Sequence, residues 1–399
     1  MSELRALLTP AGLELLDAVG PIESTADVTR TVSRLRAAGH SPELVSAVVG
    51  QAHLRSKAAA KFGPFAARML FTRAGLEQAT RLGVAARHAQ RIRHAGFTRV
   101  ADLGCGIGGD ALAFAGAGLD VHAVDADEVT SAIAAYNLAP FGDSAAVGHL
   151  TAEDALSTVE AGSAIWMDPA RRTSGHSETR RVSADDYSPS LDWAFDVAAS
   201  HPTGIKLGPA HDRDALPADA EAQWVSADGS VVELVVWSGA LAREGVRRAA
   251  LVIRDERSHE LTAPADAADE PVRELGAFLH EPDGAVIRAR LIGEVARSLD
   301  AGMLDEHIAY LTSDAALTSP FVQSFRVRET LPANPKAISA ALKAHGIGRL
   351  EIKKRGVDVD PAAFRKKLTL RGDQEATLIL ARIGDQRRAI LADRVPAAG

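Results

Sequence analysis

A glycine-rich turn between a predicted strand and a predicted helix is the feature that most constrains how this chain folds. The strand is RVADL (99–103), the helix is DALAFAGAG (110–118), and glycines occupy positions 104, 106, 108 and 109. Glycine tolerates the positive φ angles of a tight turn and lets the backbone approach a ligand closely. A strand, a glycine turn and a helix in this order are typical of the first unit of a doubly wound parallel sheet, with a ligand at the turn.

Strands and helices continue to alternate after this turn. The predicted elements are strands at 120–124, 145–150, 164–168 and 203–208, and helices at 126–138 and 190–199. Such alternation implies a parallel sheet. Two further strands, 220–226 and 231–239, are joined by Ala-Asp-Gly-Ser, which predicts a hairpin, and a strand at 248–254 follows.

The flanks of this sheet predict a helical N-terminal domain and a small C-terminal α/β domain. Apolar residues recur at three- and four-residue spacing through 3–95. The stretch 256–275 is acidic and rich in alanine and proline, which predicts an exposed connection. Further on, Asn334 and Asp360 each precede a proline and cap a predicted helix, with strands at 348–356, 376–383 and 387–395. We therefore expect an α/β protein with a helical domain at 1–95, the sheet domain at 96–255, a connecting segment with helices at 256–323 and an α/β domain at 324–399.

The composition is that of a globular protein without disulfides. Of the 399 residues, 46% are hydrophobic and 24% are charged, and Cys105 is the only cysteine. One cysteine allows neither an intrachain disulfide nor a zinc cluster, and no metal is expected. We interpret His53, His88 and His94, which lack metal-ligand spacing, as surface or core residues. Charges and Pro10 interrupt the N-terminal segment, which predicts neither a signal peptide nor a membrane span, so a cytoplasmic protein is expected.

Charge is distributed unevenly along the chain. The formal net charge is −7, but residues 55–99 carry ten lysines and arginines against one glutamate, and residues 336–371 carry ten against three acidic residues. Two basic segments around an acidic body favour a polyanionic partner. Solvated helix faces produce the same pattern, and the sequence favours both interpretations equally.

Asp102 decides which ligand fits the glycine turn. Gly104, Gly106 and Gly109, with Asp125, match the fingerprint of dinucleotide-binding proteins. In those proteins a pyrophosphate lies on the helix N-terminus, and a carboxylate two residues before the first glycine would repel it. S-adenosylmethionine instead carries an ammonium and a sulfonium, which a carboxylate attracts. We therefore expect S-adenosylmethionine as the cofactor, with Asp102, Gly104 and Gly106 in its site.

Two further carboxylates are expected to bind the nucleoside part of this cofactor. Asp125 ends the second strand, where its carboxylate can accept hydrogen bonds from the ribose hydroxyls. Asp154, after the third strand, is placed to accept from the adenine amino group, with Glu153 as the neighbouring alternative. In isolation, Asp102 and Asp125 would each be read as a cap of a loop or helix. The whole set in chain order favours the cofactor site.

Six motifs in chain order carry a resemblance to a known family. They are FTRAGLEQAT (71–80), DLGCGIGGD (102–110), MDPARR (167–172), EPDGAVIRARL (281–291), AYLTSD (309–314) and RLEIKKRG (349–356). Together they resemble the bacterial class I methyltransferases that carry a C-terminal THUMP-like domain. The resemblance runs over residues 65–395 and implies a Rossmann-like methyltransferase sheet, an N-terminal helical domain and a small α/β THUMP-like domain. THUMP-type modules accompany RNA-modifying enzymes, so the family implies RNA methylation.

The cofactor turn also resembles that of the trimethylguanosine synthases, which carry a helical segment ahead of the sheet. By that resemblance, Thr72 in the tripeptide Phe71-Thr72-Arg73 is expected at the cofactor, whereas the apolar neighbours of Phe71 equally favour a place for it in the core. This chain has Asp168-Pro169-Ala170-Arg171 where those enzymes have a Ser-Pro-Pro-Trp motif. The difference argues against guanine N2 as the target.

The end of the fourth strand is where enzymes of this fold bring the methyl acceptor. Asp168 and Arg171 are the candidate catalytic residues. The Asp168 carboxylate can hydrogen-bond an amino or imino acceptor and orient the lone pair. Arg171 stands where amino-group methyltransferases have an aromatic side chain, and it can stack on a base or bind phosphate. Carbon methylation through a cysteine nucleophile is excluded, because Cys105 lies inside the cofactor turn. The alternative is that Asp168-Pro169 only terminates the strand.

The expected reaction is therefore methylation of a nitrogen, or of an oxygen, in structured RNA, with tRNA or ribosomal RNA as substrate. The residues expected to bind RNA are basic, namely Arg172, Lys206, Lys353, Lys354, Arg355, Lys366 and Lys367. The alternatives are a methyltransferase of small molecules or proteins and a non-catalytic RNA-binding protein. The basic segments oppose the first alternative, and the intact set of cofactor and acceptor carboxylates opposes the second.

Overall fold

The computed structural model describes residues 6–171, 187–255 and 257–396, and the chain forms two compact units. The first unit comprises Met1–Leu207 and Val236–Arg243. The second unit comprises Gly208–Val235 and Glu244–Gly399. The first unit is therefore discontinuous in sequence.

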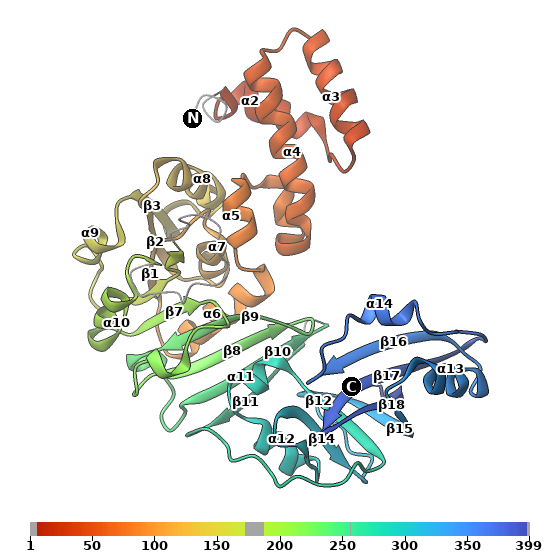
Figure 1. The fold of residues 1–399 in the computed structure, drawn as a ribbon. Coiled ribbons are helices and arrows are strands. Elements are labelled where there is room, and N and C mark those ends of the chain that lie inside the picture. Colours follow the sequence, from red (N-terminus) through yellow and green to blue (C-terminus); the bar gives the residue numbers. More distant parts are fainter. Residues whose placement is uncertain (1–5, 172–186, 256, 397–399) are drawn as a thin grey trace. The chain divides into compact units, whose positions relative to one another are not determined.

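Helices precede the first strand of the first unit, as the sequence predicts. Thr9, Ser24, Ser41 and Thr72 cap four of these helices, each accepting a hydrogen bond from a backbone N–H of the first turn. The segments are α2 (Pro10–Val19), α3 (Thr25–Ala37), α4 (Pro42–Phe62), the 3₁₀ helix η1 (Gly63–Arg68), α5 (Arg73–Gln78) and α6 (Leu82–His94) (Figure 1). Across the described part of the chain, no helix combines the length and the apolar character that a membrane span requires.

Five parallel strands form the sheet of the first unit, in the order β7-β4-β1-β2-β3. They are β1 (Arg99–Leu103), β2 (Asp120–Asp125), β3 (Ala145–His149), β4 (Ala164–Met167) and β7 (Thr203–Leu207). Helices α7 (Gly109–Gly116) and α8 (Glu128–Leu138) lie on one face, and α9 (Ala152–Leu156) and α10 (Leu191–Ser200) on the other (Figure 1). Shorter segments are η2 (Ala139–Ser144) and the paired β5 (Ala170–Arg171) and β6 (Tyr187–Ser188). The strand order reverses between β1 and β4, and sheets of this kind bind ligands at the carboxyl ends of the strands there.

An aromatic cluster fixes the position of β4. Trp166 on β4 is fully buried, and its ring centroid lies 4.4 Å from that of His88 on α6 and 5.7 Å from that of Trp237. Gly204 on β7 lies against both indoles, and a Cβ at this position would come within 2.6 Å of Trp237 and 2.7 Å of Trp166. Any larger residue at position 204 would therefore displace these buried indoles and disturb the packing around β4.

The second unit begins with a group of strands in the order β11-β10-β8-β9. They are β8 (Glu221–Ala227), β9 (Ser230–Trp237), β10 (Arg248–Arg254) and β11 (Arg257–Ala263), with the short helices η4 (Arg213–Ala215) and η5 (Gly239–Leu241) nearby in sequence. β8 and β9 are neighbours joined at Asp228-Gly229, which confirms the predicted hairpin. β10 pairs parallel with β8, and β11 pairs antiparallel with β10. The last residues of β9 belong to the first unit, where Ser238 exchanges backbone hydrogen bonds with Thr203 of β7.

The stretch 256–275 is not the plain exposed connection that the sequence predicts. Its residues 257–263 form β11, which pairs along its whole length with β10. Most of these residues are exposed, as expected, because an edge strand carries polar side chains that protect it from further pairing. The polar composition of such a strand resembles that of a loop, so the sequence indicates the exposure of this stretch but not the strand within it.

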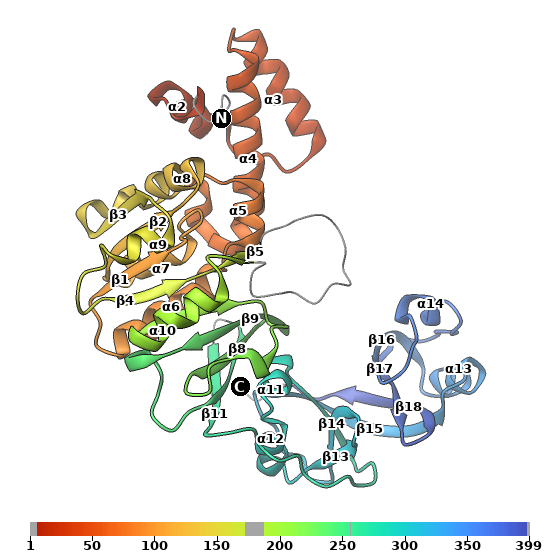
Figure 2. The same ribbon diagram turned by 60° about the vertical axis from the view of Figure 1, so that its left-hand side comes forward.

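A separate sheet of seven strands occupies the rest of the second unit, in the order β13-β14-β12-β15-β18-β17-β16. The strands are β12 (Phe278–Pro282), β13 (Gly302–Asp305), β14 (Ile308–Ser313), β15 (Val322–Pro332), β16 (Ile347–Arg355), β17 (Gln374–Ile383) and β18 (Gln386–Arg394). The helices are α11 (Gly284–Arg288), α12 (Ile292–Ser298), α13 (Pro335–Ala344) and α14 (Pro361–Arg365). α13 and α14 cover one face of β16, β17 and β18 (Figure 2). The segment 256–323 thus contains helices, as expected, but it also contributes β12, β13 and β14 to this sheet.

Candidate active site

A cavity of about 580 Å³ lies at the carboxyl ends of the parallel strands in the first unit. The glycine turn after β1, the helix α5 and the ends of β2, β4 and β7 all contribute to its lining. The cavity therefore occurs where the strand order reverses, which is the ligand position typical of such sheets.

The glycine turn is anchored to β2. Gly104 and Gly106 have φ angles of 100° and 57°, in the region that favours glycine. The backbone N–H groups of Gly104 and Cys105 both donate to the Val124 carbonyl, at 2.9 and 2.8 Å. The N–H of Gly106 donates to the Asp125 carboxylate at 3.0 Å. These contacts hold the turn open toward the cavity, as the sequence predicts.

Asp102 is a buried carboxylate at the wall of this cavity. The residue is 1% exposed, and neither carboxylate oxygen has a hydrogen-bond partner among the described residues. Burial raises the pKa of Asp102 well above the usual range, and the nearby carboxylates of Asp110 and Asp168 raise it further. A positively charged ligand group is what would satisfy such an oxygen pair.

Asp125 ends β2 at the opposite side of the turn. One carboxylate oxygen accepts from Gly106, and the other accepts from the N–H of Asp127 at 2.9 Å. Burial raises the pKa of Asp125, while these two backbone hydrogen bonds lower it. A carboxylate has about four acceptor sites, so each oxygen can still accept a hydrogen bond from a ligand hydroxyl.

The structure corrects the expectation for Asp154. Its carboxylate accepts from the Thr151 hydroxyl at 2.9 Å, its own N–H donates to the same hydroxyl, and the exposed residue does not line the cavity. Glu153, the neighbouring alternative, lines the cavity instead. Both residues lie in the first turn of α9, where adjacent side chains point in directions about 100° apart, so a difference of one position decides which reaches the ligand.

Thr72 precedes α5 at the edge of the cavity. Its hydroxyl caps α5 by accepting from the N–H of Gly75 at 2.9 Å, and the residue lines the cavity. The neighbouring Phe71 is 1% exposed and packs against Phe62, with 5.7 Å between the ring centroids. The interpretation of Phe71 as a core residue is therefore confirmed.

Asp168 follows β4 and lines the same cavity. Its carboxylate forms an ion pair with the Lys206 ammonium, which also donates to the Thr80 hydroxyl at 2.9 Å. Lys206 therefore binds a carboxylate inside the cavity, whereas the sequence predicts it at the substrate. Arg171 lies in the two-residue strand β5, which pairs with β6, and Arg172 lies outside the described residues.

Sequence reasoning missed the residues behind this ion pair. The Thr80 hydroxyl donates to one carboxylate oxygen of Asp110 at 2.8 Å, and the His88 ring nitrogen Nδ1 lies 2.9 Å from the other. Asp110 belongs to the glycine motif itself, but it stands in the first turn of α7, where an acidic residue is expected for helix stability alone. Thr80 and His88 reach it only because α6 packs on α7.

Comparison with known proteins identifies the family. The chain is 33% identical over 359 residues to an uncharacterised S-adenosylmethionine-dependent methyltransferase found in two strains of Mycobacterium tuberculosis, covering 88% of this chain and 95% of that protein. The chain belongs to the S-adenosylmethionine-dependent methyltransferases. The activity and the cofactor expected from the sequence are thereby confirmed.

Three further matches cover the ends and the fold of this methyltransferase. A family model described as THUMP domain-like matches residues 322–394, and a domain of unknown function, DUF8688, matches residues 1–58. A solved structure from Porphyromonas gingivalis, described as a candidate methyltransferase, has the same fold, with a TM-score of 0.72 and 20% identity. The alignment covers 94% of this chain and 99% of that one. The predicted fold class and the THUMP-like region are confirmed.

The charges that line the cavity fit S-adenosylmethionine and oppose a dinucleotide. Among the described lining residues Lys206 is the one cation, whereas six residues carry carboxylates: Asp102, Asp110, Asp125, Asp127, Glu153 and Asp168. A pyrophosphate would be repelled by this set, and a ligand with an ammonium and a sulfonium would be attracted. The unpartnered oxygens of Asp102 are the most direct sign of that fit.

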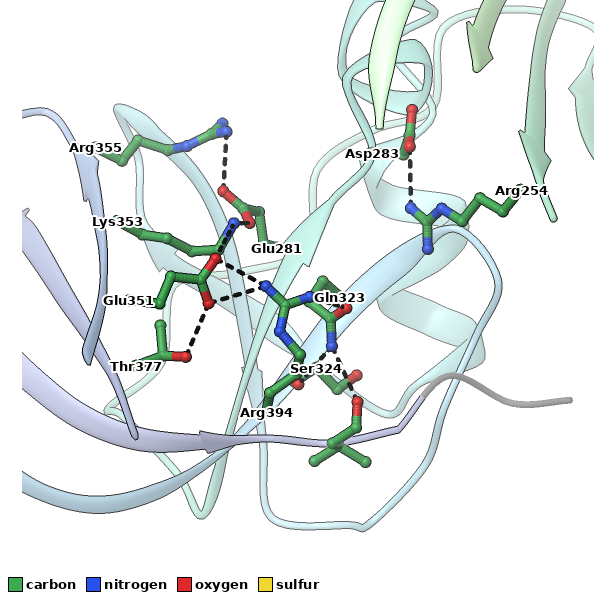
Figure 3. Close-up of polar contacts among 11 residues, drawn as sticks. Arg254, Glu281, Asp283, Gln323, Ser324, Glu351, Lys353, Arg355, Thr377 and Arg394 are labelled. Atoms are coloured by element: carbon green, nitrogen blue, oxygen red, sulfur yellow. Dashed lines mark hydrogen bonds and ion pairs between the residues drawn. The ribbon is translucent and has the colours of Figure 1, made fainter. Parts of the chain in front are cut away.

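The methyltransferase has two kinds of basic residue in its THUMP-like region. Lys353 Nζ binds Glu281 at 2.6 Å, and Arg355 lies 3.7 Å from the other oxygen of Glu281 (Figure 3). The Arg355 guanidinium also lies 5.1 Å from the ring centroid of Tyr310. The expectation that Lys353 and Arg355 bind substrate is therefore corrected, because their charges are paired with Glu281 of β12 inside the unit.

The other three basic residues predicted for this region are exposed. Lys354, Lys366 and Lys367 lie on β16 and at the end of α14, and within the described residues none of them forms an ion pair or a side-chain hydrogen bond. Along β16, alternate side chains point to opposite faces, which separates Lys354 from Lys353 and Arg355. These three residues remain the candidates for binding a polyanion.

Proposed function

We propose that this methyltransferase methylates a nitrogen of a nucleotide in structured RNA, with tRNA or ribosomal RNA as the substrate. The observation that carries the proposal is the Asp168 carboxylate, which lines the cofactor cavity at the end of β4 and is held by Lys206. The THUMP domain-like match at residues 322–394 supports RNA as the substrate class, because THUMP-type modules accompany RNA-modifying enzymes.

The cofactor is proposed to bind along the glycine turn. Asp102 would pair with the ammonium of the amino-acid part, and Asp125 would accept hydrogen bonds from the ribose hydroxyls. Glu153, rather than Asp154, would accept from the adenine amino group. Thr72, together with the backbone of Gly104 and Gly106, would line the two sides of the bound molecule.

Bound S-adenosylmethionine supplies a methyl group whose carbon a nitrogen lone pair can attack, with the carbon–sulfur electron pair passing to sulfur. Asp168 would accept a hydrogen bond from an N–H of the acceptor, which orients the lone pair toward the methyl carbon. Once the new bond has formed, the nitrogen has one proton too many, and the Asp168 carboxylate can take it and pass it to solvent. Arg171 would bind the acceptor by stacking on its base or by contacting its phosphate.

Nucleoside mass spectrometry tests this function directly. RNA from a strain that lacks the gene is compared with RNA from the same strain carrying the wild-type chain or the Asp168→Ala variant. We expect one methylated nucleoside to disappear with the gene and to return with the wild type but not with the variant. RNA nucleosides that are identical in all strains, with methyl transfer to a protein or a small molecule instead, would overturn the proposal.

A further inference from the structure

The two carboxylates beside the reacting groups have different surroundings. Asp102 has no hydrogen-bond partner among the described residues, whereas Asp168 forms an ion pair with Lys206. The Lys206 side chain is 11% exposed, so its ammonium is largely shielded from water. One fixed cation therefore pairs directly with Asp168, and its charge also acts on the nearby Asp102, where it partly offsets the rise in pKa that burial causes.

A chain of buried hydrogen bonds sets the position of that cation. Lys206 Nζ donates to the Thr80 hydroxyl, Thr80 donates to Asp110 at 2.8 Å, and His88 contacts Asp110 at 2.9 Å. A hydroxyl has one proton. Because Thr80 donates its hydrogen bond to Asp110, only its lone pairs remain to accept a hydrogen bond from Lys206. The direction of each hydrogen bond is thus determined by the next one.

Both ends of this chain are attached to β4. At one end Lys206 holds Asp168, directly after β4, and at the other end the His88 ring lies against Trp166, with 4.4 Å between the centroids. His88, Thr80 and Asp110 are 1%, 7% and 7% exposed. Burial raises the pKa of Asp110, but hydrogen bonds with His88 and Thr80 and the charge of the nearby Lys206 hold it below its usual range. Asp110 is therefore an anion that keeps the ammonium of Lys206 in place.

We propose that Lys206 is a positioning residue for methyl transfer: held by the Thr80–Asp110–His88 chain, it keeps Asp168 ionised and oriented toward the acceptor and leaves Asp102 to the ammonium of the cofactor. This inference rests on the proposed role of Asp168. Without Lys206, the carboxylates of Asp168, Asp102 and Asp110 would repel one another across the cavity, and Asp168 would take up a proton at higher pH.

The test is the pH dependence of single-turnover methyl transfer to RNA from the strain that lacks the gene, measured between about pH 5 and pH 9. The rate is expected to fall on the acidic side of this pH profile as Asp168 takes up a proton. In Lys206→Met, the midpoint of this acidic limb should move upward by about one pH unit or more, because the cation that favours the ionised carboxylate is missing. Thr80→Val, which removes the hydroxyl between Lys206 and Asp110, should move it in the same direction by less. Thr80→Ser restores the hydroxyl and should return the midpoint to the wild-type value.

Calorimetry with S-adenosylmethionine gives a readout that does not depend on RNA. At alkaline pH, where Asp102 is ionised with or without the Lys206 charge, Lys206→Met should bind the cofactor more tightly than wild type or no more than about threefold more weakly, because it removes a cation from a site for a cation. An unchanged acidic limb in both Lys206→Met and Thr80→Val, or a loss of cofactor affinity beyond about tenfold, would overturn the inference. Asp168→Asn distinguishes the proposed role of Asp168 from that of Lys206. Full activity in Asp168→Asn would refute the role of Asp168 itself. An inactive Asp168→Asn, together with wild-type midpoints in Lys206→Met and Thr80→Val, would refute only the role of Lys206.

Discussion

Asp102 combines nearly complete burial with a carboxylate that no described residue hydrogen-bonds. An unpaired buried carboxylate costs the folded protein free energy, and the raised pKa of Asp102 reflects that cost. A bound ammonium would offset it. The same residue is therefore expected to lower the stability of the ligand-free protein and to strengthen cofactor binding.

A pair of ligands with and without the charged amino-acid part of the cofactor can isolate this residue. We expect Asp102→Asn to weaken S-adenosylmethionine binding by roughly 10- to 100-fold, the loss typical of a hydrogen bond to a charged group. The same variant should bind 5′-methylthioadenosine, which lacks the ammonium, as wild type does. Asp125→Ala is the control, because it should weaken both ligands through their common ribose. Calorimetry that shows equal losses for both ligands in Asp102→Asn would contradict the assignment.

The pH dependence of the same variant follows from the sign of the pKa shift. Because the folded ligand-free protein holds a proton on Asp102 more tightly than the unfolded chain does, wild type loses stability as the pH rises from the usual aspartate range to the raised value. Asp102→Asn does not lose it, so its ligand-free form should melt at a higher temperature than wild type at alkaline pH. In wild type, cofactor affinity should fall as the pH falls below the raised pKa.

Residues in the glycine turn could be predicted from sequence because their spacing along the chain fixes their spacing in space. Asp102 is the penultimate residue of β1 and Asp125 is the last residue of β2, both next to that turn, which leaves little freedom for their position. Thr80, Asp110 and His88 could not be grouped in this way, because they meet only through the packing of α6 on α7. The choice between Asp154 and Glu153 depends on helix phase, which a short polar segment does not determine to one residue.

At the scale of elements, α5 is a short helix on which the cavity depends. Its six residues are too few for a helix that is stable by itself. Lys61 on α4 donates to three carbonyl oxygens at the end of α5, those of Leu76, Glu77 and Ala79, at 2.8, 2.7 and 2.8 Å. Burial lowers the pKa of this lysine, so the three carbonyls receive a partly desolvated ammonium.

We expect Lys61→Met to loosen α5 rather than to unfold the protein. Amide hydrogen exchange over residues 73–80 should become faster, and S-adenosylmethionine should bind more weakly, because α5 lines the cavity. The loss of three hydrogen bonds to a charged group, partly replaced by water, should cost about 1–3 kcal/mol in the free energy of unfolding. Lys57→Met is the matched control, since Lys57 is exposed on the same helix. Equal exchange rates in the two variants would contradict a role for Lys61 in holding α5.

Elements with a strong periodic pattern were predictable, and short or polar ones were not. The parallel strands are apolar and buried, as in β4, where all four residues are buried. β11 is a polar edge strand, and β13 has only four residues, so neither presents a pattern that differs from a loop. Of the sheet of β12–β18, the sequence predicts β16, β17 and β18 and misses the four strands before them.

For the whole molecule, exposed and internally paired cations in the THUMP-like region should behave differently. Replacing Lys354, Lys366 and Lys367 together with alanine should weaken RNA binding and lower the slope of its salt dependence by about two to three, while cofactor affinity stays unchanged. Lys353→Ala should instead lower the melting temperature, because it leaves Glu281 without its ammonium partner, and should keep the slope. Filter binding over a range of salt concentrations measures both slopes. A triple variant with the wild-type slope would move the RNA surface to the basic helices at residues 55–99.

Point variants are the sharper test of this region because a truncation would damage the sheet. β15, β16, β17 and β18 lie in one sheet with β12 and β14, and β12 pairs directly with β15. Phe325 and Ile390 share a core cluster with Leu279 and Tyr310. Removing residues 324–399 would therefore expose that cluster to water and invite aggregation.

The order in which the chain leaves the ribosome matters for the first unit. Trp237, which packs against Trp166, is synthesised thirty residues after β7 is complete, and Val236–Arg243 follow a stretch that belongs to the second unit. A nascent chain that has emerged only to Leu207 has all the parallel strands but lacks the indole that supports β4. Newly made protein should therefore be unable to retain its cofactor until the hairpin of β8 and β9 has emerged, and a shortened chain that ends at residue 207 should be captured by chaperones rather than fold into a minimal enzyme.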